Sequence, residues 1–128
     1  MKGILFSIMS LLIITGCSSE TILKTGEQID ESTVKFNNEI TNKEEIEKVK
    51  KILDQMEKTN IKDIPEDYPD TVLLIQNSDE NYNELNISIW YNDNNTLIHT
   101  GMVDYKEGNF YKLENNQSDK LKEILKNN

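Results

Sequence analysis

The feature that most constrains the fold is a change of hydrophobic period along the chain. Ile46, Val49, Leu53 and Met56 recur at three- and four-residue spacing, which is the apolar stripe of an amphipathic helix. From residue 71 onward, apolar residues instead form a short continuous run and then alternate with polar ones, as they do in strands. A helix followed by a series of strands predicts an α+β domain.

Local signals set the expected boundaries of these elements. Thr41, followed three residues later by Glu44, forms a capping box that predicts where the helix begins. Strands are expected at 33–36, 71–76, 85–91, 96–103 and 109–113, with a final helix at about 118–126. We therefore predict an antiparallel β-sheet meander with an amphipathic helix before it and a short C-terminal helix, in a two-layer arrangement with both helices on one side.

The N-terminus has the layout of a secretory signal. Lys2 is followed by an eleven-residue apolar run from Ile4 to Ile14. A membrane-spanning helix needs about 20 apolar residues, so this run is too short to be a permanent anchor. The segment is therefore predicted to direct export.

The end of that signal, Ile14-Thr15-Gly16-Cys17, resembles the bacterial lipobox. The resemblance implies that the peptide bond before Cys17 is cut and that the Cys17 sulfur receives a diacylglyceryl group. Two acyl chains are enough to hold a soluble domain stably on a bilayer. The expected location is the outer face of the cytoplasmic membrane; the alternative is a plain signal peptide that happens to contain a cysteine.

The predicted processing also defines the domain organisation. Removing residues 1–16 leaves 112 of the 128 residues, which suits one domain and a short tether. Residues 17–31 are mostly polar and lack helical or strand periodicity, and they are predicted to be a lipidated tether with a reach of about 20 Å. Residues 32–128 are predicted to form a single α+β extracytoplasmic domain.

Composition excludes several kinds of function. Cys17 is the only cysteine, so its lipidation would leave no thiol for disulfides, catalysis or metal binding. Loss of Lys2 would leave 13 lysines against 23 acidic residues. This charge disfavours nucleic-acid binding and flat docking of the domain on an anionic leaflet.

Several segments resemble the YhfM-like group of small bacterial lipoproteins. The resemblance is carried by residues 40–46 leading into 52–53, by 87–90 and by 110–113, and it covers roughly residues 33–126. It implies the fold and the location. The function of that group is unassigned, so the resemblance transfers no functional residues.

No motif predicts a catalytic residue, a metal site or a cofactor. His99 is the only histidine, and without cysteines it cannot complete the usual zinc ligand set; we expect it to be solvent-facing or at a rim. The stretch from Asn77 to Asn83 superficially resembles a calcium loop but lacks the glycine at the sixth position and the glutamate at the twelfth. It is predicted to be a polar turn.

Trp90 is the candidate partner-binding residue. It alternates with Ile87 and Ile89 and shares the opposite strand face with Asn86 and Ser88, so a sheet covered by helices on one face would leave it on the uncovered face, where aromatic residues often anchor partners. The alternatives are ordinary sheet packing, or a cover formed by the terminal helix or by residues 59–70 that would place Trp90 in the core.

These features favour a non-enzymatic binding or accessory module of unknown ligand, with an envelope protein as its possible partner. The alternative is an envelope-directed enzyme or inhibitor that uses carboxylates not yet identified, since 23 acidic residues allow many pairs. A third possibility is a subunit that completes another complex.

Overall fold

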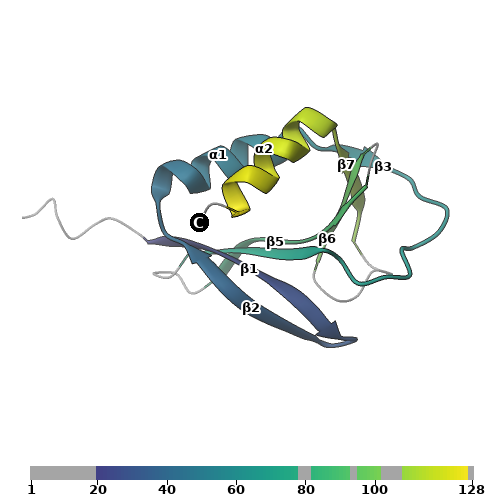
Figure 1. Cartoon of the computed structure of the whole chain (residues 1–128), viewed down its shortest axis with the longest axis horizontal. Coiled ribbons are helices and arrows are strands. Elements are labelled where there is room, and N and C mark those ends of the chain that lie inside the picture. The colour runs from purple at the N-terminus through teal and green to yellow at the C-terminus, as the bar shows by residue number, and fades with distance from the viewer. Residues whose placement is uncertain (1–19, 78–81, 93–94, 102–107, 127–128) are drawn as a thin grey trace, which may run out of the picture.

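The computed structural model describes residues 20–77, 82–92, 95–101 and 108–126, which form a seven-stranded antiparallel sheet with two helices on one side of it (Figure 1). The elements are β1 (Thr21–Asp30), β2 (Thr33–Ile40), α1 (Lys43–Leu53), β3 (Glu57–Thr59), β4 (Thr71–Asn77), β5 (Tyr82–Tyr91), β6 (Thr96–Thr100), β7 (Phe110–Leu113) and α2 (Asn115–Lys126). The predicted α+β class is confirmed. Neither described helix is long and apolar enough to cross a membrane.

The strand order is β2-β1-β4-β5-β6-β7-β3. Strands β4 to β7 form the predicted meander, because each pairs with the next along the chain. The helix α1 precedes this meander as predicted, but it does not precede the whole sheet, since it connects β2 at one edge to β3 at the other. Two strands already precede it, and one of them lies inside the sheet.

Strand β1 replaces most of the predicted tether. Residues Thr21 to Gly26 pair with β4, and β1 also pairs with β2 on its other side. The tether prediction for 17–31 and the domain start at 32 were therefore wrong. The helix-facing side of β1 carries one large apolar residue, Leu23, which is fully buried. Because Ile22 and Leu23 are adjacent and the next five residues are not large apolar ones, the segment shows no alternation of apolar and polar residues and resembles a linker.

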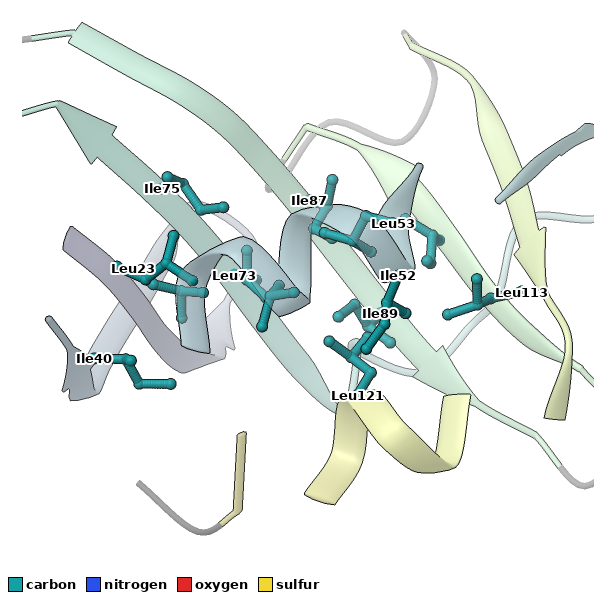
Figure 2. Close-up of a cluster of buried hydrophobic side chains, with 13 residues drawn as sticks. Leu23, Ile40, Ile52, Leu53, Leu73, Ile75, Ile87, Ile89, Leu113 and Leu121 are labelled. Atoms are coloured by element: carbon teal, nitrogen blue, oxygen red, sulfur yellow. The ribbon is translucent and has the colours of Figure 1, made fainter. Parts of the chain in front are cut away.

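The core lies between the sheet and the helices. It contains Leu23, Ile40, Leu73, Ile75, Ile87, Ile89, Ile98 and Leu113 from the strands and Ile46, Val49, Ile52, Leu53 and Leu121 from the helices (Figure 2). The helical stripe read from the sequence therefore faces the sheet as predicted. Each such side chain contributes roughly 1.5–3 kcal/mol when it is removed from water, so this layer supplies the main driving force for folding.

The first helix is capped one residue later than predicted. Asn42, not Thr41, is the N-cap, and its side-chain oxygen accepts hydrogen bonds from the backbone amides of Glu44 and Glu45 at 2.9 and 3.2 Å. Asparagine is at least as good an N-cap as threonine, because its short side chain reaches the free amides of the first turn. The capping-box prediction was therefore wrong in its residue.

Replacing the cap tests this assignment. We expect Asn42→Ala to lower the free energy of unfolding by about 1 kcal/mol, because two amides of the first turn lose their acceptor. Thr41→Ala is the matched control and should change it by less than about 0.5 kcal/mol, since Thr41 is exposed and does not cap the helix. Urea unfolding of both variants measures the difference, and a larger loss for Thr41→Ala would contradict the Asn42 cap.

Candidate functional site

An open groove of about 640 Å³ runs between α1 and α2. Its lining consists of Glu45, Lys48, Lys51, Ile52 and Gln55 from the α1 side and Gln117, Lys120, Glu123 and Ile124 from α2. Ile52 is buried and Ile124 partly buried, and the other seven lining residues are polar or charged. A groove that combines apolar and polar groups is a candidate binding site.

The groove differs in charge from the chain as a whole. Its lining holds three lysines and two glutamates, whereas the chain carries a net charge of −9. One of the lysines, Lys48, lies 3.7 Å from the carboxylate of Glu45. The groove is thus locally positive by one charge, and an anionic group is repelled less there than over most of the surface.

Trp90 is buried, not exposed. It keeps 6% of its surface accessible, its indole Nε1 donates a hydrogen bond of 2.9 Å to the backbone oxygen of Asp67, and its ring lies 6.2 Å from that of Phe110. The expectation of an exposed Trp90 was wrong, and the alternative that residues 59–70 cover this face is confirmed. The partner contact suggested for Trp90 therefore lacks the free surface on which it depended.

The covering segment is fixed to β5 at its end. The amide of Asp70 donates to the Ile89 oxygen at 2.8 Å, and the Asp70 carboxylate accepts from the Tyr91 amide at 2.7 Å. Pro69, one position earlier, is buried. The segment therefore pairs the Asp70 amide, the Tyr91 amide and the Trp90 indole, so these groups are not left unpaired where it lies over the sheet.

His99 is also buried, so the prediction of a solvent-facing or rim histidine was wrong. It is fully inaccessible and its ring lies 4.7 Å from that of Phe110. Gly101 and Gly108 both have positive φ angles, and a Cβ on Gly108 would come within 3.1 Å of His99 Nε2. The chain therefore packs tightly around His99. This residue lies on the sheet face away from the helices and is not an accessible base.

A smaller hollow of about 260 Å³ lies beside Tyr91 and the first half of α2. The Lys122 ammonium sits 4.5 Å from the Tyr91 ring centroid, and a buried hydroxyl pair links Thr96 to Ser118. Burial raises the pKa of Tyr91 to about 12, so its phenol stays protonated at neutral pH. These contacts attach α2 to β5 and β6 and have a structural role.

The remaining predicted sites are placed as follows. Cys17 lies outside the described residues, as do Asp79 and Asn81 of the stretch that resembles a calcium loop. Within the described ranges, no three histidine, cysteine or acidic side chains gather closely enough to hold a metal ion. The groove was not predictable from the sequence, because its lysines and glutamates resemble the solvated face of any amphipathic helix.

Trp90 provides the test of the covered face. We expect Trp90→Ala to cost about 3–5 kcal/mol of unfolding free energy, because a large buried side chain leaves a cavity. The control is Tyr68→Ala in the covering segment, where an exposed side chain should matter by less than about 0.5 kcal/mol. Thermal unfolding reports both, and an unchanged midpoint for Trp90→Ala would show that this face is open in solution.

Comparison of the chain with protein-family models, with curated proteins and with solved structures finds no match. The resemblance to the YhfM-like lipoproteins therefore stays a prediction.

Proposed function

We propose that this chain is a non-enzymatic binding or accessory module, anchored by a lipid on Cys17 to the outer face of the cytoplasmic membrane. The observation that carries the binding role is the groove between α1 and α2, whose lining combines Ile52 and Ile124 with an excess of one lysine over the glutamates. The lipobox supports the location. The resemblance to a group of small lipoproteins is consistent with both.

The chemistry of the groove indicates the kind of partner. Ile52 and Ile124 offer apolar contact, while Lys51 and Lys120 stand on opposite walls of the groove. An amphipathic polypeptide segment with acidic residues beside its apolar stripe fits this arrangement, since helices commonly bind in grooves between two other helices through such a stripe. We therefore propose an acidic segment of an envelope protein as the occupant.

The rival proposal of an enzyme or inhibitor has less support. It needs convergent carboxylates with perturbed pKa values in a cleft. The pKa of Asp30 is lowered, chiefly by a hydrogen bond from the backbone amide of Ser32, but this carboxylate is exposed in the β1–β2 turn. The perturbation is one that a tight turn produces, and it is remote from the groove.

The lipid anchor is tested at its one modified atom. We expect Cys17→Ser to abolish incorporation of labelled fatty acid, because a serine hydroxyl cannot replace the thiol in the thioether linkage. The variant should either leave the membrane fraction or accumulate in its unprocessed form. Metabolic labelling followed by fractionation measures both, and a variant that still carries labelled lipid would refute the anchor at this position.

The groove is tested by reversing the charge of its walls. The partner is captured by cross-linking it to the lipidated chain at the native membrane. With the double change Lys51→Glu and Lys120→Glu, we expect the amount of captured partner to fall at least tenfold, equivalent to about 1.4 kcal/mol of binding free energy. Lys35→Glu on the exposed surface of β2 is the matched control and should leave capture unchanged. If the double variant and the Lys35→Glu control reduce capture equally, the groove is not the binding surface.

A further inference from the structure

Strand β1 begins only four residues after Cys17. A fully extended chain advances at most about 3.6 Å per residue, so Thr21 can lie no farther than about 14 Å from Cys17. A flexible tether of 14 residues would instead allow an average reach of about 20 Å and a much longer maximum. The position of β1 therefore leaves the domain little freedom to stand away from its anchor.

The end of the domain that must stay near the anchor is defined by strand pairing. Thr21 pairs with Asn77 at the end of β4, and Leu23 pairs with Ile40, two residues before the Asn42 cap of α1. Figure 1 shows the end of α2 at this same end of the molecule's long axis. We call this end of the domain, which contains Thr21, Asn77, Ile40 and Asn42, the proximal end.

Two segments, the β1–β2 turn and residues 60–70, lie far from the proximal end. Ten residues of β1 span about 30 Å at the usual rise per residue, which places the β1–β2 turn at the far end of that strand. Segment 60–70 enters β4 at Thr71, the end of β4 opposite to Asn77. All three large hydrophobic residues that are exposed in the described part of the chain lie in or beside these segments: Ile29 (54%), Ile64 (43%) and Tyr68 (44%).

Charge gives the domain a preferred tilt on an anionic leaflet. Segment 60–70 carries four acidic residues and one lysine, and the end of β1 with its turn, residues 27–31, carries three acidic residues and no lysine. The two helices together carry seven lysines and five acidic residues. An anionic surface repels the two acidic segments but not the helices, and this force acts within a Debye length of about 8 Å.

We infer that the lipid holds the proximal end against the bilayer headgroups, with the β1–β2 turn and segment 60–70 facing away from the membrane. This inference rests on the proposed lipidation of Cys17. It also narrows the choice of partner, because α1 starts at the proximal end and is about 16 Å long. The groove then lies beside the bilayer, where the extracytoplasmic segment of a membrane protein can reach it.

The orientation can be measured with single labels. Lipidation consumes the only thiol, so an introduced cysteine is a unique attachment point in the lipidated chain. We choose Thr41→Cys at the proximal end and Glu31→Cys in the β1–β2 turn, both at exposed positions. Each protein is labelled with a fluorophore and reconstituted in vesicles that contain anionic lipid and a headgroup-attached energy acceptor, after its unfolding midpoint has been matched to that of the unsubstituted chain.

We expect several-fold more energy transfer at position 41 than at position 31. Insertion of about 14 glycine and serine residues between Ser19 and Glu20 should reduce the transfer at position 41, because the longer tether frees the domain. Equal transfer at both positions, or no response to the insertion, would overturn the orientation. If the chain does not enter the vesicle fraction, the anchor itself is refuted, and that outcome is distinct from a lipidated chain with the wrong orientation.

Discussion

The structure depends on the burial of both faces of its central strands. Val72, Leu73, Leu74 and Ile75 are consecutive in β4 and all are buried, although side chains on a strand alternate between faces. Two separate covers are therefore required. The helices supply one through a continuous apolar core. On the other face, segment 60–70 lies over Trp90, whose indole donates a hydrogen bond to the backbone oxygen of Asp67. Neither cover alone would keep β4 and β5 out of water.

Long periodic segments were predictable from the sequence. The stripe of α1 and the alternation of β5 each repeat over two or more periods, and β4 is a continuous apolar run. Burial of Leu53 and Ile87 followed from these patterns. Strand β1 was missed because Leu23 is its one large apolar residue facing the helices, and the adjacent Ile22 leaves no alternating pattern. The cap was misplaced by one residue because Thr41 and Asn42 are both good capping residues, and only the backbone angles decide between them.

The candidate site illustrates a different limit. The alternation on β5 placed Trp90 on the correct face, and the phase of β6 placed His99 opposite Ile98, but exposure depends on what covers that face. The cover contains Asp63, Glu66 and Asp67, residues that a sequence reading assigns to solvent. The groove was hidden for a related reason, since Ile52 and Ile124 are 72 positions apart. A helical pattern shows which residues share one helix face but not which second helix will lie beside it.

The position of β1 links the fold to the proposed anchor. Chain termini usually fray unless a strand or helix holds them in place, and Thr21 to Gly26 are held by β4 on one side and largely by β2 on the other. A force transmitted from a lipid on Cys17 therefore acts first on a strand bound along both edges. Such a strand cannot separate without breaking two ladders of hydrogen bonds, so the domain would move with its anchor as one body. If the proposed lipid anchor holds, a groove on that body would stay close to the bilayer, which would favour partners that are themselves fixed in the membrane.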